Sequence, residues 1–304
     1  MWRIETRHKL DDAEFDSVKR LVAEAAAHDG FPPLSDQLLI DLERRDAHHF
    51  SGVVAFDPPG DLAGYAQLSK ANESTEMELV VAPTHRDALE PLMPLLLRAA
   101  LAAAVADGAG RVYWWVHHPD DGTDAVASAA GLHLARRLLQ MRRPLPIEAG
   151  TTVDTRAFVV GRDEAEWLRV NNAAFLGHPE QGGWTMETLR LRELEPWFYP
   201  AGFRLHERDG RLTAFCWTKV HEEVEPRLGE IYVIGVDPSF HGLGLGKALT
   251  IAGLHSLADR GVTVGMLHVD AANTAAMSLY ERLGFAVHHE DHAYMAETIR
   301  SRPS

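Results

Sequence analysis

The sequence has little cysteine, no long apolar run and a deficit of positive charge. Its 304 residues include one cysteine, Cys216, so no disulfide bond can form within the chain. No apolar stretch approaches the ~20 residues that a membrane-spanning helix needs. The N-terminal residues 1–12 are charged and lack the apolar core of a secretion signal. From these absences we expect a cytoplasmic protein.

Acidic residues outnumber basic residues by 44 to 30, which gives a formal net charge of -14 at pH 7. A chain of this charge is not expected to bind nucleic acid or an anionic membrane, whereas its acidity suits a site that attracts an amine. The remaining composition, 46% hydrophobic and 24% charged, is that of an ordinary globular protein. The length predicts about two domains of roughly 150 residues each.

One stretch, residues 229–249, has the pattern of a strand, a glycine-rich loop and the start of a helix. β-Branched residues fill the strand, and Asp237-Pro238 ends it because proline lacks the N–H that a strand ladder needs. Alternate glycines in 242–246 bring bare backbone to a helix that begins near Leu245. Unpaired N–H groups at a helix start bind anions, phosphate above all. The stretch therefore predicts a site for a phosphate-bearing cofactor.

The two halves of the chain repeat the same order of predicted helices and strands. Gly131 follows Glu78 by 53 residues, and Gly284 follows Glu230 by 54 residues. This spacing indicates an internal duplication. Helices alternate with largely antiparallel strands in each half, which predicts an α/β chain with mixed sheets of the α+β type.

The best boundary between the halves is residues 142–150, which contain two prolines and a glycine. We therefore expect two tandem domains, at residues 1–145 and 151–304.

The second half resembles the GNAT N-acetyltransferase family in its strand GEIYVIGVDP, its loop HGLGLG, Asn273, and Tyr280-x-x-x-Gly284-Phe285. A glycine loop alone is weak evidence, but these features stand together at the family's spacing. The family's loop begins with arginine or glutamine, so His241 is a departure, although the backbone N–H at that position does much of the binding. The resemblance implies two tandem GNAT acetyltransferase domains, acetyl-CoA as co-substrate, and no metal.

The resemblance implies roles for two side chains. Glu230 matches the base that takes the proton of the acceptor amine, and Tyr280 matches the acid that protonates the departing CoA thiolate. Backbone N–H groups at Ile234 to Val236 would stabilise the negative charge of the attacked carbonyl. The alternatives are a strand-edge glutamate without a catalytic role and a tyrosine that only packs.

The same match supplies the cofactor-binding residues. They are Ile234, Gly235, Val236, His241, Gly242, Leu243, Gly244, Leu245, Gly246, Lys247, Asn273, Thr274, Ala275, Ala276, Met277 and Ser278, with Leu79, Val80 and Val81 in the first half. The first half has no glycine from Ala82 to Asp107. Without a glycine loop we expect it to be non-catalytic, to help form the substrate pocket, and to bind acetyl-CoA weakly at most.

A narrower similarity is carried by residues 171–184, 215–221 and 228–238 on a duplicated chain. These segments resemble tandem-domain actinobacterial members of the family that acetylate the cysteinyl amine of cysteinyl-glucosaminyl-inositol. The residues that match their substrate-binding positions are Asp36, Glu180, Lys219, Glu230 and His268. Asp36 stands where those enzymes have glutamate and His268 where they have tyrosine, so both contacts are altered.

Two other functions stay open. The first is acetyl transfer to another small amine, a lysine or a protein N-terminus; the second is a non-catalytic acyl-CoA sensor. Cys216 lacks the partners of a nucleophile, and the histidine-rich segments 117–118 and 288–292 lack metal-site spacing. We expect a monomer with a small-molecule substrate and no nucleic-acid or membrane partner.

Overall fold

The structure is a computed structural model that describes residues 1–44, 50–70, 74–87, 91–178, 181–222 and 224–297. The chain divides into two compact units. Unit 1 consists of Met1–Arg137 with Glu290–Ser304, and unit 2 consists of Leu138–His289. This division differs from the sequence repeat, whose boundary is expected at residues 142–150, because strands β6 (His133–Pro144) and β12 (Ala286–Glu297) each contribute residues to both units.

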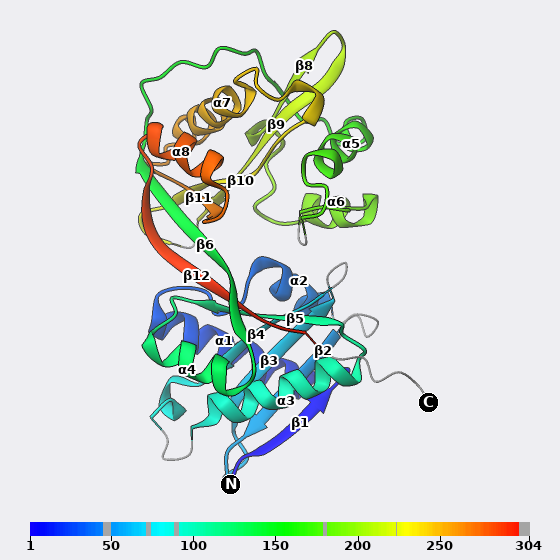
Figure 1. The fold of residues 1–304 in the computed structure, drawn as a ribbon, viewed down its shortest axis with the longest axis vertical. Coiled ribbons are helices and arrows are strands. Elements are labelled where there is room, and N and C mark those ends of the chain that lie inside the picture. The colour runs from blue at the N-terminus through cyan, green and yellow to red at the C-terminus, as the bar shows by residue number, and fades with distance from the viewer. Residues whose placement is uncertain (45–49, 71–73, 88–90, 179–180, 223, 298–304) are drawn as a thin grey trace. The chain divides into compact units, whose positions relative to one another are not determined.

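Unit 1 is a mixed sheet covered by helices on both faces (Figure 1). Its strands follow the order β1-β2-β3-β4-β5-β12, and β4 and β5 form the one parallel pair among those described. The strands are β1 (Arg3–Arg7), β2 (Phe50–Phe56), β3 (Leu62–Lys70), β4 (Thr75–Val81), β5 (Arg111–His117) and β12. The helices are α1 (Asp12–Asp29), α2 (Asp36–Arg44), α3 (Leu92–Ala106) and α4 (Asp121–Ala129), with a 3-10 turn at Pro83–His85.

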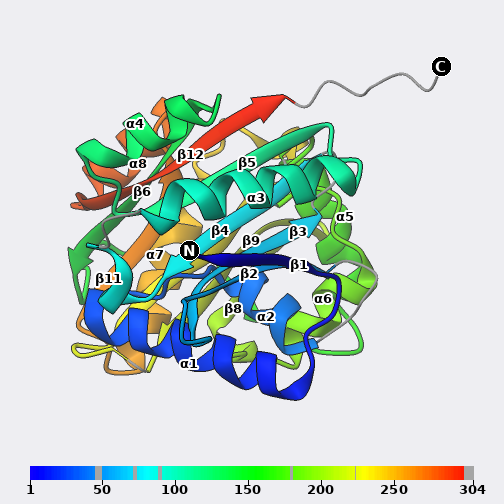
Figure 2. The same cartoon turned by 90° about the horizontal axis from the view of Figure 1, so that it is seen from below.

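The core of unit 1 has two layers. The alanine- and leucine-rich helix α3 packs on one face of the sheet, and α1 and α2 pack on the other. Figure 2 shows α3 and α1 on opposite sides of these strands. Residues of a strand point alternately to the two faces, so consecutive residues of β4 belong to different layers, with Met77 under α3 and Val80 under α1 and α2.

Unit 2 repeats this design with the strand order β6-β11-β10-β9-β8-β7. Its strands are β6, β7 (Arg156–Ala157), β8 (Phe203–Arg208), β9 (Arg211–His221), β10 (Leu228–Val236) and β11 (Val264–Asp270). Its helices are α5 (Glu164–Ala174), α6 (Met186–Glu193), α7 (Leu245–Asp259) and α8 (Thr274–Arg282), with 3-10 turns at Pro200–Gly202 and Pro238–Phe240. The mixed-sheet fold class predicted from the sequence is confirmed.

Helix α7 lies unusually close to strands β9 and β10. A Cβ atom at Gly253 would come within 2.5 Å of the Cys216 sulfur and 2.8 Å of the Ile231 side chain. Only glycine allows this approach. The aromatic cluster on the other face includes Trp167, Trp184, Trp197 and Trp217, which therefore serve as core residues under α5 and α6.

Strand β7 is short, although the apolar run at residues 157–160 favours an extended conformation. The backbone N–H of Val159 donates to the buried carboxylate of Asp163 at 2.8 Å, and the N–H of Gly161 donates to Glu164. These hydrogen bonds turn the chain into α5 after Ala157, so the apolar pair Val159-Val160 is exposed.

Candidate active site

Strand β10 separates from β11 in its second half. Among the described residues, the parallel pairs run from Leu228 with Val264 to Ile231 with Leu267. A β-bulge follows between Ile231 and Val233 in the pairing with β9. Bulges re-aim a strand and often lie beside active sites. The β11 side of residues 234–236 therefore carries no ladder partner among the described pairs.

One face of the unit 2 sheet carries a row of polar side chains, which we call the polar stripe. The opposite face holds Cys216, Ile231 and Leu267 in the apolar cluster beneath α7. Strand alternation places the neighbours of these residues on the α5 and α6 side. The strand registers bring six polar residues of this face side by side. They are Lys219 and His221 on β9, Glu230 on β10, His268 on β11, and Gln140 and Arg142 on β6.

Glu230 lies within the polar stripe and is 7% exposed. His221 Nε2 is 2.9 Å from its Oε2 atom, and His268 Nδ1 is 3.2 Å from its Oε1 atom. Burial opposes ionisation, but the hydrogen bonds from the two imidazoles outweigh it and hold the pKa of Glu230 below its usual range. The site therefore presents an ionised carboxylate, which can bind an ammonium group.

Tyr280 lies on α8, in the apolar cluster on the other face of the sheet. Burial, with a smaller contribution from Cys216, raises the pKa of its phenol to about 12. The hydroxyl group therefore keeps its proton at neutral pH. Asn273 caps α8, since its side chain accepts the N–H of Ala276 at 3.1 Å.

The glycine loop leads directly into the first turn of α7. Gly242 and Gly244 have φ angles of 80° and 76°, in the left-handed region that favours glycine. Gly244 is the N-cap of α7, no side chain caps this end, and the first turn has no acidic residue. The N–H groups at the helix start are thus available to an anion. This end of α7 fits the pyrophosphate of a CoA molecule.

His241 turns away from this loop. Its Nε2 atom lies 3.2 Å from the carbonyl oxygen of Val236, so the imidazole N–H donates to the end of β10. The departure from arginine or glutamine therefore changes a side chain that folds back on the strand, while the glycine backbone keeps its conformation.

Residues 167–285 match the model of the acetyltransferase (GNAT) family. A protein named mycothiol acetyltransferase from Thermomonospora curvata is 44% identical over 94% of this chain and 95% of its own length. A protein of the same name from Streptomyces griseus is also 44% identical, over 97% of this chain and 96% of its own. The chain belongs to the GNAT acetyltransferase family. Its expected activity as an acetyl-CoA-dependent N-acetyltransferase is thereby confirmed.

Solved structures show the same fold. A GCN5-related N-acetyltransferase from Sphaerobacter thermophilus matches with a TM-score of 0.71 and 23% identity, over 97% of this chain and 95% of that chain. A tandem GNAT protein from the clavulanic acid pathway matches over the whole of both chains, with a TM-score of 0.69 and 16% identity. The tandem GNAT architecture predicted from the sequence is confirmed.

The structure brings some of the predicted site residues of this GNAT chain together. Lys219 lies opposite Glu230 in the β9–β10 register, with its Nζ atom 5.0 Å from the centre of the Trp197 ring, and His268 contacts Glu230 directly. Asp36, at the start of α2, and Leu79–Val81 on β4 belong to unit 1. Glu180 lies outside the described residues.

Sequence reasoning missed three members of the polar stripe, His221, Gln140 and Arg142. His221 had a signal, because it stands two residues after Lys219 on the same strand and therefore on the same face. Gln140 and Arg142 had none, since the pairing of β6 with β11 joins residues from different halves of the sequence repeat.

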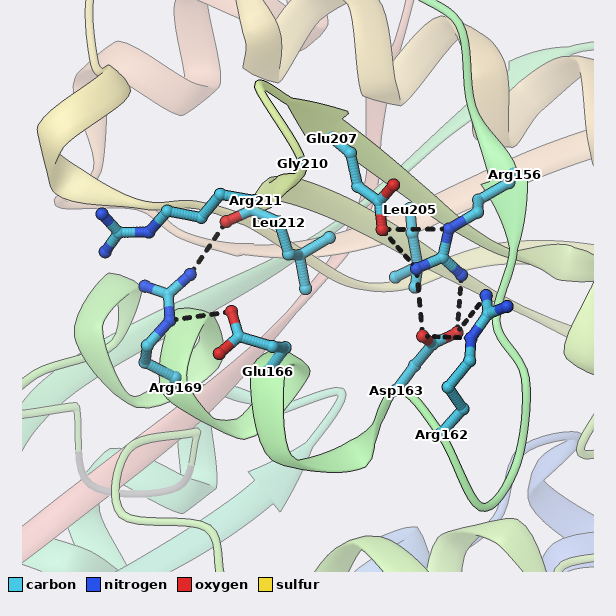
Figure 3. A pocket seen from close by; sticks show the side chains of 10 residues that line it. All are labelled: Arg156, Arg162, Asp163, Glu166, Arg169, Leu205, Glu207, Gly210, Arg211 and Leu212. Carbon is cyan, nitrogen blue, oxygen red and sulfur yellow. Dashed lines mark hydrogen bonds and ion pairs between the residues drawn. The ribbon is translucent and has the colours of Figure 1, made fainter.

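A cavity of about 420 Å³ lies elsewhere in unit 2, between α5 and strands β7 to β9 (Figure 3). Figure 3 shows Arg156 and Arg162 on Asp163, and Arg169 between Glu166 and the carbonyl group of Leu212. Its arginines are thus engaged with carboxylates and carbonyls of the protein itself. None of its lining residues belongs to the polar stripe, so the cavity is separate from the candidate active site.

The part of the chain that the structure describes lacks two further kinds of feature. No helix there is long and apolar enough to cross a membrane. No group of three or more histidine, cysteine, aspartate or glutamate side chains there is placed to hold a metal ion. Cys216 is fully buried, and burial raises the pKa of its thiol to about 12, which keeps the thiol protonated and unreactive.

Proposed function

We propose that this chain transfers the acetyl group of acetyl-CoA to the cysteinyl amine of cysteinyl-glucosaminyl-inositol, which gives mycothiol. The observation that carries the proposal is the 44% identity to proteins named mycothiol acetyltransferase over nearly the whole of both chains. The buried carboxylate of Glu230, placed beside the split between β10 and β11, supports it chemically.

Glu230 is the proposed base. A free α-amine has a pKa of ~8, so it is mostly protonated at neutral pH and must lose a proton before it can attack. The ionised Glu230 binds the ammonium group and takes the proton, directly or through water. Attack is direct, without an acyl-enzyme, because the one cysteine of the chain is buried and protonated.

Tyr280 is the proposed acid. Acetyl-CoA supplies an activated thioester, and its thiol would leave as a thiolate that needs a proton. Tyr280 keeps its proton at neutral pH and lies in the cluster on the other face from Glu230. The β10–β11 pairing ends at Ile231, and we propose that the thioester lies beyond that point, where groups from both faces of the sheet could reach it. Backbone N–H groups at 234–236 would stabilise the carbonyl oxygen.

The proposed cofactor site extends from the glycine loop to α8. Residues 241–247 would hold the pyrophosphate on the N–H groups that start α7, and residues 273–278 would line the pantetheine arm. Both the left-handed glycines and the uncapped end of α7 support this assignment. Leu79–Val81 are proposed as the corresponding contact of the non-catalytic unit 1.

The proposed acceptor site uses the polar stripe. Lys219 and His268 flank Glu230 in the described structure, and charged and polar groups of this kind bind the hydroxyl groups of a sugar and an inositol. Asp36 and Glu180 are proposed as further contacts from the family match. We further propose that the chain has two tandem domains, at residues 1–145 and 151–304, that it is a monomer and that it is cytoplasmic.

The test is an acceptor comparison with the purified protein. CoA release from acetyl-CoA is followed with cysteinyl-glucosaminyl-inositol, with glucosaminyl-inositol that lacks the cysteine, with a short peptide, and with a polyamine. We expect the cysteinyl compound to give a kcat/KM at least 100-fold above the others. Equal or better turnover of the peptide or polyamine would overturn the acceptor assignment, and acetyl-CoA binding without turnover of any amine would indicate a sensor.

A further inference from the structure

The two units carry the same arrangement of a glutamate and a histidine on neighbouring parallel strands. In unit 2, Glu230 pairs with Met266, and His268 follows two residues later on the same face. In unit 1, Met77 pairs with Trp114, so the register continued by one residue sets Glu78 beside Trp115, with His117 two residues later. His117 and His268 therefore occupy equivalent positions.

In both units the histidine pairs with a residue of the next strand, but the two residues at this equivalent position differ. His117 pairs with Asp291 on β12, and His268 pairs with Gln140 on β6. One histidine thus lies between two carboxylates, and the other lies between a carboxylate and a neutral amide. This single difference sets the charge of each imidazole.

In unit 1 the imidazole is a cation. His117 Nε2 lies 3.6 Å from Glu78 Oε1, and His117 Nδ1 lies 3.3 Å from Asp291 Oδ2. Burial disfavours the charged ring, but the two carboxylates outweigh it and raise the pKa of His117 to about 10. At neutral pH the charge of Glu78 is therefore already compensated.

In unit 2 a chain of hydrogen bonds fixes the opposite state. Arg142 Nε donates to Gln140 Oε1 at 2.7 Å, and a guanidinium can only donate, so the amide N–H₂ of Gln140 faces the ring of His268. Gln140 Nε2 is 3.4 Å from His268 Nε2, which must accept. The proton of the ring is then on Nδ1, which donates to Glu230. Only a neutral imidazole satisfies this order.

We propose that Gln140 is a positioning residue that keeps His268 neutral, so that the negative charge of Glu230 remains available for the ammonium group of the acceptor. Asp291 does the reverse for Glu78: it helps to keep His117 charged, so the charge of Glu78 is compensated and the carboxylate of unit 1 would bind an amine poorly. The inference rests on the proposed function in one respect, the assignment of Glu230 as the base.

The other charged groups of the polar stripe surround Glu230 and Gln140 and also bear on the charge of His268. Lys219 and His221 face Glu230 from β9, and Arg142 lies beside Gln140 on β6. Arg142 carries a permanent positive charge beside Gln140, the residue that pairs with His268, and this charge disfavours a further positive charge on the imidazole ring. A carboxylate at position 140 would favour the charged ring instead, because it would accept a hydrogen bond from His268 Nε2 and stabilise the imidazolium.

The experiment compares two variants of similar shape, Gln140→Glu and Gln140→Met, with the full-length protein at saturating acetyl-CoA over pH 6–9.5. For Gln140→Glu we expect kcat/KM for the amine to fall at least tenfold at pH 7 and to recover as the pH rises, since the imidazolium loses its proton there. The KM for acetyl-CoA should not change. Gln140→Met removes the amide N–H₂ group without adding a charge, so its fall in kcat/KM should be smaller than that of Gln140→Glu and should not reverse as the pH rises.

The same pair of substitutions in a His268→Tyr background isolates the imidazole. Gln140→Glu should no longer move the pH profile there, because no ring remains to be charged. A shift that persists in this background, or equal profiles for Gln140→Glu and Gln140→Met, would overturn the proposal.

A measurement without turnover separates this inference from the proposed function. ¹⁵N–¹H correlation spectra of the histidine rings at pH 7 should show His268 as the neutral Nδ1–H form and His117 as an imidazolium, with assignments from His268→Tyr and His117→Gln. An imidazolium signal for His268 would contradict the inference even if the enzyme acetylates its acceptor. A neutral signal in a protein that acetylates no amine would leave the charge assignment standing and remove only the proposed function.

Discussion

The guanidinium group of Arg169 and the buried carboxylate of Asp237 form a hydrogen-bonded ion pair with an N–O distance of 2.7 Å. Asp237 also accepts the N–H of Ser239 at 3.0 Å, at the turn between β10 and the glycine loop. Burial opposes its ionisation, but these bonds outweigh burial and hold the pKa of Asp237 below its usual value. Helix α5 is thereby tied to the segment that positions the phosphate site.

Arg169→Gln should weaken this tie. We expect a loss of about 1–3 kcal/mol in the free energy of unfolding, because a buried carboxylate loses its main partner. The KM for acetyl-CoA should rise several-fold while kcat changes little, since the loop supplies binding and no proton transfer. Urea denaturation and steady-state kinetics measure the two effects.

Arg162→Gln is the matched control for Arg169→Gln. Arg162 also pairs with a buried carboxylate, that of Asp163, but Asp163 keeps Arg156 as a second partner. We expect a smaller loss of stability and no change in the KM for acetyl-CoA. An equal rise of KM in both variants would refute a specific link between α5 and the loop.

Gly244→Ala tests the backbone of the glycine loop. The φ angle of 76° at Gly244 costs an alanine about 1–2 kcal/mol, and relief of that strain would turn the first N–H groups of α7. We expect lower stability and at least a tenfold higher KM for acetyl-CoA. Gly210→Ala, at a φ of 74° in the β8–β9 turn and equally free of clashes, should lose similar stability with an unchanged KM. Identical kinetics of the two variants would argue against the loop as the phosphate site.

Glu230→Gln tests the proposed base. Loss of a positioned base reduces kcat by about 10²–10⁴-fold. The fall should be the same across pH 6–9, because the lowered pKa of Glu230 keeps the parent carboxylate ionised throughout that range. The near-identical shape of the amide should leave the KM for acetyl-CoA unchanged. Turnover equal to that of the parent protein would show that the base lies elsewhere.

The charge of His117 predicts a pH dependence of stability. In the unfolded chain an imidazole has a pKa of ~6.5, and in unit 1 the pKa of His117 is raised to about 10. A raised pKa contributes stability that is complete below pH ~6.5 and is lost as the pH rises toward 10. The free energy of unfolding should therefore fall over this interval, and His117→Gln should flatten the slope. His28→Gln, at an exposed position, should retain the parent slope; a flattened slope in both would exclude His117 as the cause.

The features that could be read from the sequence are local ones. The glycine loop and the strand before it depend on residues within a few positions of one another, where strand period and proline rules apply. Glu230, on that strand, was assigned through the family resemblance. The duplicated order of elements likewise follows from spacing. These patterns located the strand, the loop and α8 without knowledge of what pairs with them.

The features that could not be read depend on distant pairing. Gln140 contacts His268 across 128 positions of the sequence, and nothing near either residue indicates that β6 lies beside β11. The long sequence separation of paired strands also hides the division of β6 and β12 between the units, which a repeat-based boundary at residues 142–150 does not predict. The end of β7 is a further example, because the apolar run at 158–160 favours a strand, whereas the Asp163 carboxylate accepts the N–H of Val159 and turns the chain.

Strand β12 has a consequence for how the protein is made. Its residues 291–297 pair with β5, although every other strand of unit 1 lies before residue 138. During translation all of unit 2 must leave the ribosome before this last strand can dock. Until then β5 is an edge whose open backbone groups are available to other chains. The unit that is synthesised first is therefore the one whose sheet is completed last. During most of synthesis the edge of β5 is exposed, and we expect chaperones to bind the nascent chain in this interval.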